Sequence, residues 1–209
     1  MAATSRTSSF TAPDAQPMGL RERKKLKTRV AIRTATYRLI QEQGYEATTI
    51  EQIAEAAEVS PSTVFRYFAT KEDIVLTDEY DPVMVAALRS RPLDEPPLES
   101  LRLMMREALT SLPAAEDEEL RRRTRLMVEI PAVRARMTET MSDTAKPLSQ
   151  VLADRTGRNA EDLHIRIFIA AVLGTLREVT LYWGEHGQEG DLITMIDEAL
   201  DTLETGLRL

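Results

Sequence analysis

The chain has 209 residues, of which 43% are hydrophobic, and carries a formal net charge of −7. This length and hydrophobic content suit one large domain or two small ones with ordinary buried cores, and exclude a disordered chain. The sequence contains no Cys and only two His, which excludes disulfides and thiolate zinc sites and gives no pattern for a metal site. No uncharged run is long enough to cross a bilayer and no secretory signal is recognisable, so we expect a cytoplasmic protein.

Positive charge is concentrated in the first part of this acidic chain. Residues 1–77 contain 11 Lys and Arg against 9 Asp and Glu, whereas residues 78–209 contain 16 against 25. Residues 21–38 alone hold eight basic side chains and one acid. Such a stretch can form a phosphate-facing patch on a protein that is acidic elsewhere. Taken alone, it is also compatible with an ordinary solvated helix.

The first element in the chain follows an irregular segment. Residues 1–19 are rich in Ser, Thr, Ala and Pro, show no hydrophobic period and predict a flexible tail. From Leu20 to Gln43 apolar residues recur at helical spacing on one face, which predicts a helix. Gly44 is placed to end it.

Two short helices joined by a tight turn are predicted between Thr48 and Lys71. An apolar stripe at helical spacing marks the first of them. Its start is indicated by either of two capping boxes, Thr48 with Glu51 or Thr49 with Gln52, in which the side chains satisfy free N–H groups. A pair of short helices with a tight turn is typical of a helix-turn-helix.

The second of these helices has an outward face suited to DNA. Ser60 can cap it and Pro61 fits its first position, while Val64 and Phe68 lie four residues apart and should pack inward. The outward residues carry hydroxyls, one guanidinium and two aromatic edges: Ser62, Thr63, Phe65, Arg66 and Tyr67. Such a surface suits base edges and phosphates in a major groove. Similar helix corners also occur in proteins that bind no DNA.

The remainder of the chain is predicted to be helical. A fourth helix, capped by Thr70, begins at Lys71, and we expect it to continue past Pro82 to Leu88. Prolines 92, 96 and 97 then form a connector. Five further helices are predicted over residues 98–112, 116–130, 131–157, 160–186 and 191–207.

The last two predicted helices carry the most apolar surface. Residues 167–176 have no polar face, and residues 191–207 have a continuous apolar stripe. A monomeric bundle would not easily bury both, so we predict a homodimer that pairs these helices with their copies. The predicted fold is all-α: a tail at residues 1–19, a three-helix helix-turn-helix domain at residues 20–78, and a C-terminal bundle of about five to six helices at residues 79–209.

The order of the motifs resembles a known family. The pairs TT, IA and VS at residues 48–60, the run STVFRYF at 62–68 and KED at 71–73 resemble the DNA-binding domain of TetR-family transcriptional regulators. Gly44 and Tyr45 agree as well. The resemblance implies a homodimer that is most often a repressor, with a small-molecule effector bound by its C-terminal domain. It also implies phosphate contacts at Thr49, Tyr67 and Lys71, and groove-facing residues at Pro61, Ser62, Thr63, Phe65 and Arg66.

The C-terminal half also resembles the branch of this family described as having an acyl-CoA-like ligand-binding domain. The similar segments are DEYDP, RSRPLDEPPLESLR and EIPAVRARM. Flexible methionines adapt to varied apolar ligands, and an arginine can bind an anion. The candidate ligand-binding residues are Met104, Met105, Arg106, Met127, Met141 and Trp183. Trp183 could line a pocket mouth or the dimer interface. Equally, the methionines could be ordinary core and the arginines a solvated face.

These observations predict a ligand-responsive regulator without a cofactor or metal. We expect a repressor that binds a palindromic double-stranded operator as a homodimer and is released by an acyl-CoA-like or other apolar effector. No membrane partner is expected. An enzyme lacks support, because no catalytic triad spacing, metal-ligand cluster or glycine-rich phosphate loop is present. A ligand-binding helical dimer or scaffold without specific DNA binding is the remaining alternative.

Overall fold

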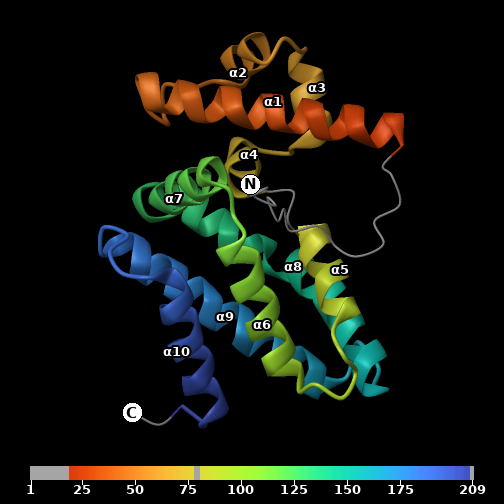
Figure 1. The fold of residues 1–209 in the computed structure, drawn as a ribbon. Coiled ribbons are helices and arrows are strands. Elements are labelled where there is room, and N and C mark those ends of the chain that lie inside the picture. The colour runs from red at the N-terminus through yellow and green to blue at the C-terminus, as the bar shows by residue number, and fades with distance from the viewer. Residues whose placement is uncertain (1–18, 78–80, 208–209) are drawn as a thin grey trace, which may run out of the picture. The chain divides into compact units, whose positions relative to one another are not determined.

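The computed structural model describes residues 19–77 and 81–207, and over these ranges the chain forms ten helices (Figure 1). The predicted all-α class is confirmed. The helices are α1 Leu20–Gln43, α2 Ile50–Ala56, α3 Pro61–Tyr67, α4 Lys71–Leu76, α5 Asp81–Ser90, α6 Pro97–Thr110, α7 Ala114–Glu129, α8 Pro131–Thr156, α9 Leu163–Glu185 and α10 Leu192–Glu204. The tail predicted at residues 1–19 lies outside the described residues, apart from Gly19.

The described chain divides into two compact units. One, called the head here, contains residues 19–77 and 121–140, and the other, called the body, contains residues 81–120 and 141–207. The head therefore includes the second part of α7 and the first part of α8, in addition to the predicted helix-turn-helix. The predicted boundary near residue 78 separates α4 from α5 but does not follow this grouping.

The head packs α1 to α4 around one apolar core. In Figure 1, α2 and α3 lie on one side of α1 and α4 on the other. The core side chains are buried and come from all four helices or their ends: Ile32, Ile53, Ala54, Val64, Phe68 and Ile74. Each is an inward position of an amphipathic helix, because residues three or four apart share a face. Val64 and Phe68 face inward as predicted.

Side-chain caps define the starts of the short helices. Thr49 and Gln52 form a complete capping box at α2, which selects between the two predicted boxes. Thr48 instead is buried and donates its hydroxyl to the Gly44 carbonyl at 2.8 Å. Gly44 ends α1 with φ +86°, a conformation that other residues adopt at a cost.

The prediction of a fourth helix running past Pro82 is wrong. The helix α4 ends at Leu76, and Thr77 is extended, with φ −81° and ψ 131°. A separate helix, α5, begins at Asp81, which makes Pro82 its second residue. Proline is tolerated in a first helical turn, where its missing N–H has no partner to lose, and disrupts a helix interior.

The body core joins four helices. Buried side chains from α5, α6, α8 and α9 meet in one cluster: Ala87, Leu88, Leu101, Met104, Val151 and Val172. A neighbouring cluster packs α8 against α9 through Leu152, Ile165 and Ile169. The connector that the prolines predicted lies between α5 and α6, and Arg155 of α8 donates to several of its carbonyls, including Arg91 O at 2.9 Å and Pro92 O at 2.7 Å.

The helix α9 is only partly buried. Ile165, Ile169 and Val172 are buried in the core, whereas Leu163, Ile167 and Tyr182 are exposed by 67%, 57% and 52%. The helix α10 packs beside α9 and buries Ile196 and Leu200 (Figure 1). Among the described helices, none combines the length and apolarity needed to cross a membrane.

Candidate nucleic-acid interface

The outward face of α3 is open to solvent. Pro61, Ser62 and Arg66 are exposed, and the Phe65 ring is 56% exposed although it is large and apolar. Thr63 is half-buried and its N–H donates to the Ser60 hydroxyl at 3.1 Å, which caps the helix. The predicted groove-facing residues are therefore brought together on one surface of a short, capped helix. Such a surface offers hydroxyl, guanidinium and aromatic groups to base edges.

Two of the predicted phosphate contacts are Thr49, which caps α2, and Tyr67, at the end of α3. Thr49 is exposed, and its hydroxyl, although it accepts the N–H of Gln52 at 3.3 Å, still has its proton to donate. The Tyr67 ring packs against the head core, and the Arg66 guanidinium carbon lies 5.4 Å from the ring centroid. This contact is within cation–π range and orients the arginine.

Lys71, the third predicted phosphate contact, is engaged inside the protein. Its ammonium donates to the carbonyl oxygens of Tyr45 at 2.7 Å and Thr48 at 3.0 Å, and lies 3.9 Å from the Tyr45 ring centroid. The Tyr45 hydroxyl in turn donates to Glu72 Oε1 at 2.6 Å. Burial would raise the pKa of Glu72, but hydrogen bonds, first that from Tyr45, lower it overall. These contacts join residues about 25 positions apart, so no local sequence pattern indicates them.

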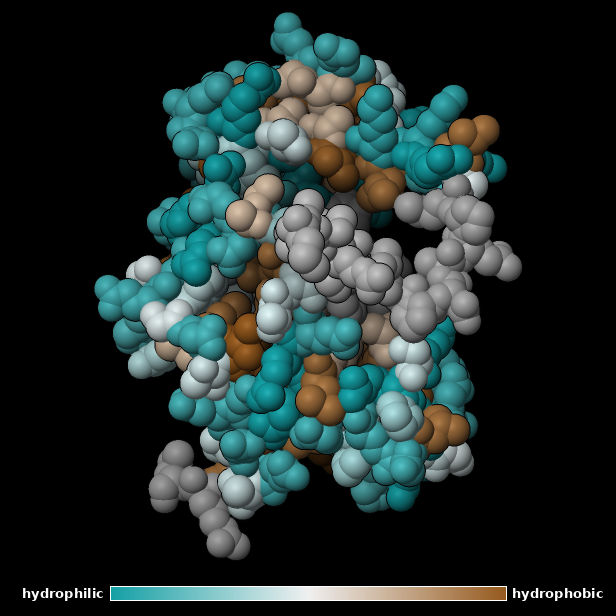
Figure 2. Space-filling view, viewed as in Figure 1, coloured by the Kyte–Doolittle hydropathy of each residue, from teal (hydrophilic) through white to brown (hydrophobic). Residues whose placement is uncertain are grey.

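The basic stretch forms an exposed patch on the first turns of α1. Arg21, Arg23, Lys24, Lys25 and Lys27 are all exposed. Figure 2 shows hydrophilic residues over much of the visible surface of the head. Several like charges on one solvated helix attract phosphates through the summed field, with no need for a fixed contact.

The comparisons with known proteins agree with this geometry. Residues 32–77 match the family model for bacterial regulatory proteins of the tetR family, and residues 95–208 match the MftR C-terminal domain. The HTH-type transcriptional regulator TcmR of Streptomyces glaucescens is 35% identical over 173 residues, which cover 79% of this chain and 76% of TcmR. The chain belongs to the TetR family. It is a transcriptional regulator with a DNA-binding helix-turn-helix, and not an enzyme.

Other similar proteins have names that refer to fatty acids. The fatty acid metabolism regulator protein of Bacillus subtilis is 22% identical over 181 residues, which cover 83% of this chain and 92% of that protein. The solved structure of the fatty acid degradation regulator FadR from Bacillus halodurans aligns with a TM-score of 0.55 and 25% identity, covering 92% and 99% of the two chains. FadR from B. subtilis in complex with stearoyl-CoA aligns with a TM-score of 0.57 and 24% identity, which shows the shared fold.

The candidate ligand-binding residues of this TetR-family chain occupy different environments. Met104 is buried in the body core, and Met105 packs against the same cluster. Met127 belongs to the head, whereas Met141 is a half-buried residue of the body. Trp183 is only 1% exposed, so it lies in the interior and at neither a pocket mouth nor a free surface.

Arg106, the candidate anion anchor, already has a partner. Its guanidinium pairs with the Asp197 carboxylate of α10 at 2.5 Å. The neighbouring Arg102 is held by the same helix, with Asp201 at 2.7 Å. These arginines link α6 to α10, so an anionic ligand would have to compete with fixed carboxylates for Arg106.

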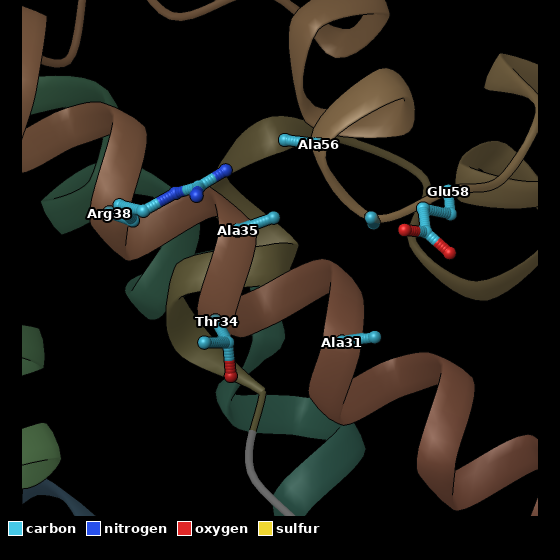
Figure 3. Close-up of a pocket in the computed structure, with 7 residues that line it drawn as sticks. Ala31, Thr34, Ala35, Arg38, Ala56 and Glu58 are labelled. Atoms are coloured by element: carbon cyan, nitrogen blue, oxygen red, sulfur yellow. The ribbon is translucent and has the colours of Figure 1, made fainter.

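The head of this TetR-family protein also has a groove, and none of its lining residues is on α3. It has a volume of about 400 Å³ and lies between α1 and the end of α2 (Figure 3). Small side chains form most of it, with one charged residue from each helix region: Ala31, Thr34, Ala35, Arg38, Ala56, Ala57 and Glu58. The groove is open and lined mostly by alanines, and its polar side chains are Thr34, Arg38 and Glu58.

Proposed function

We propose that this regulator binds an operator in double-stranded DNA, with α3 in the major groove. The observation that carries the proposal is the exposed set on α3, where Ser62, Phe65 and Arg66 face solvent while Val64 and Phe68 fix the helix to the core. Thr49, Tyr67 and the basic start of α1 supply the contacts to phosphates. Phosphate contacts position such a head, and base contacts give it sequence preference.

The proposed operator is a palindrome that is bound by a homodimer. On α9, Leu163, Ile167 and Tyr182 are more than half exposed, and the smaller exposed residues Ala170 and Ala171 lie on the same face. An exposed apolar stripe of this kind on a helix, which Glu178 interrupts before Tyr182, supports pairing with a second copy. A two-fold dimer would engage half-sites about 34 to 36 Å apart, or a multiple of this distance.

Selection from a random DNA library tests this proposal. The purified full-length protein is mixed with duplexes that contain a random central segment, and bound duplexes are amplified and sequenced. We expect enrichment of an inverted repeat. Fluorescence anisotropy then compares the enriched duplex with a scrambled duplex over a salt series, because a sequence-independent charge interaction weakens with salt for both. Equal affinity for the two duplexes would reject specific operator binding.

The proposed effector is an acyl-CoA-like or other apolar molecule that weakens operator binding, which would make the protein a repressor relieved by its ligand. The support is the similarity to regulators named for fatty acid metabolism, together with the apolar, methionine-containing core of the body. Met104, Met105, Met127, Met141, Arg106 and Trp183 remain the candidate ligand residues. A ligand shifts the equilibrium only by its difference in affinity for two forms, typically about 1 to 3 kcal/mol.

Titration with stearoyl-CoA tests the effector class. The ligand is added to the complex of protein and enriched duplex, and the anisotropy is followed. We expect release of the DNA by stearoyl-CoA, and no release by free coenzyme A, which lacks the acyl chain. Retention of the DNA at saturating stearoyl-CoA would reject an acyl-CoA effector and leave the DNA-binding proposal untouched.

A further inference from the structure

We propose that Lys71 is a positioning residue of the head, which acts on DNA through the loop before α2 and does not itself neutralise a phosphate. The proposal rests on the DNA-binding function proposed above, and it changes the role that the family resemblance implies for Lys71. The residue on which it would act is Thr49.

The first step is the occupancy of the Lys71 ammonium. It has three N–H donors, and two of them are directed to the carbonyl oxygens of Tyr45 and Thr48, at 2.7 and 3.0 Å. The Tyr45 ring covers another side of the same group at 3.9 Å. The two carbonyl groups and the Tyr45 ring thus stabilise the positive charge inside the protein. For Lys71 to bind a phosphate, it would have to share or break these contacts.

The second step concerns the peptide bond between Thr48 and Thr49. Its carbonyl oxygen accepts from Lys71, and its N–H donates to Gln52 Oε1 at 2.9 Å. Because a peptide unit is planar, holding both its oxygen and its N–H fixes the orientation of the whole unit. That unit directly precedes the Thr49 side chain, so Lys71 sets the direction in which the Thr49 hydroxyl points.

The third step is that the first turn of α4 also holds Tyr45, at its hydroxyl and at its carbonyl oxygen. Tyr45 is buried, and its hydroxyl donates to Glu72 while its carbonyl accepts from Lys71. Burial, followed by the Glu72 carboxylate, raises the pKa of the Tyr45 hydroxyl, so it stays a donor. Residues 45–48 are therefore attached to α4 by side chains adjacent in sequence, and loss of Lys71 frees the end of the loop that is nearer Thr49.

Hydrogen exchange in the protein without DNA is the first test. Lys71→Met keeps the aliphatic stem and removes the donors, and we expect faster exchange of the amides of residues 45–49 than in the wild type. Lys24→Met is the matched control, because it removes an equally charged but exposed side chain of α1. We expect it to leave this loop unchanged. Unchanged exchange of the loop in Lys71→Met would overturn the proposal.

The salt dependence of DNA binding is the second test. For the enriched duplex we expect Lys71→Met to weaken binding about tenfold at every salt concentration, the size of one charge-assisted hydrogen bond. The slope of log K against log salt should stay at the wild-type value. A direct phosphate contact predicts instead that the slope falls by about 0.9, and that outcome would overturn the proposal.

A double variant separates the two roles again. If Lys71 acts through Thr49, the affinity losses of Lys71→Met and Thr49→Ala should not add when the two are combined, since residues that share one pathway couple. Additive losses would contradict the proposal. Absence of specific binding by the wild type would instead reject the proposed function, while the exchange experiment would still report on the loop.

Discussion

At the scale of single residues, neighbours on α3 have different environments because a helix turns by about 100° per residue. Arg66 is exposed, whereas Tyr67 is half-buried and its ring lies against the head core. The cation–π contact between them, at 5.4 Å, orients the guanidinium. The two side chains should therefore respond differently to the choice of DNA sequence.

Arg66→Ala tests the base-reading role. We expect it to relax the preference at particular positions of the enriched duplex and to cost about 1 to 3 kcal/mol on that duplex, with little change on scrambled DNA. Tyr67→Phe is the companion variant, because it removes only the hydroxyl; it should weaken binding to both duplexes alike. Anisotropy with single-base variants of the duplex measures both effects. A uniform loss for Arg66→Ala would assign it to the phosphates.

The ionisation of Glu95 is expected to affect the stability of the body at acidic pH. Hydrogen bonds from Arg91, the largest cause, and from Ser100 lower the pKa of Glu95 from 4.5 to about 2. Since the pKa is depressed in the folded state, this carboxylate stabilises the fold above pH 4.5, and the contribution is lost as the pH falls from 4.5 toward 2. Glu95→Gln should therefore have the larger deficit at neutral pH and a smaller one near pH 2. Thermal unfolding followed by circular dichroism checks this, and a deficit independent of pH would contradict it.

At the scale of the elements, local chemistry made most of the head predictable. The bounds of α1, the capping box at α2, Ser60 and Pro61 at α3, and Thr70 at α4 all depend on residues within a few positions of each other. The continuation of α4 past Pro82 failed, because periodicity alone does not distinguish one helix from two that are separated by a short break. The contacts of Lys71 and Asp73 were not predictable, since their partners lie far away in sequence.

The ion pair between α4 and α8 is the clearest of these distant contacts. Arg136 of α8 donates to both oxygens of Asp73, at 2.7 and 3.2 Å, while Asp73 also accepts the Thr70 N–H in the α4 capping box. One carboxylate thus fixes the start of α4 and attaches it to α8. Because α8 is continuous from the head into the body, a shift of α8 caused by an effector would be transmitted to α4 through this pair.

Arg136→Met tests that route. We expect the variant to bind the enriched duplex, but with a smaller change in affinity on adding stearoyl-CoA than the roughly 5- to 150-fold typical of coupled sites. Glu139→Gln is the control, since Glu139 accepts from the same guanidinium at 3.0 Å without contacting α4. The ratio of DNA dissociation constants with and without the ligand is the readout. Equal ratios for wild type and Arg136→Met would exclude this pair from the coupling.

At the scale of the whole molecule, the sequence predicted where the helices lie along the chain better than how they divide between the head and the body. Apolar periodicity located its helices, but the segment of α9 without a polar face is only partly buried, with Ile169 and Val172 in the core and Ile167 exposed. Periodicity does not reveal which helices share a unit, so the assignment of residues 121–140 to the head was not foreseen. The sequence also does not decide whether Met104 and Trp183 are core or ligand-lining residues, because both kinds of position use the same apolar residue types.

The α9 stripe allows the homodimer to be tested independently of DNA. Ile167→Glu places a charge in the middle of the exposed apolar face, where burial against a second copy would leave the carboxylate without water or a partner. We expect this variant to sediment as a monomer. Its affinity for the palindromic duplex should fall by about a hundredfold, the lower range of what two linked contacts add, while its affinity for a single half-site stays unchanged.

Leu93→Glu is the matched control, since Leu93 is 74% exposed on the connector between α5 and α6. It should remain dimeric. If both variants sediment like the wild type, the stripe is not the dimer interface, and the exposed apolar side chains of α9 must have another role.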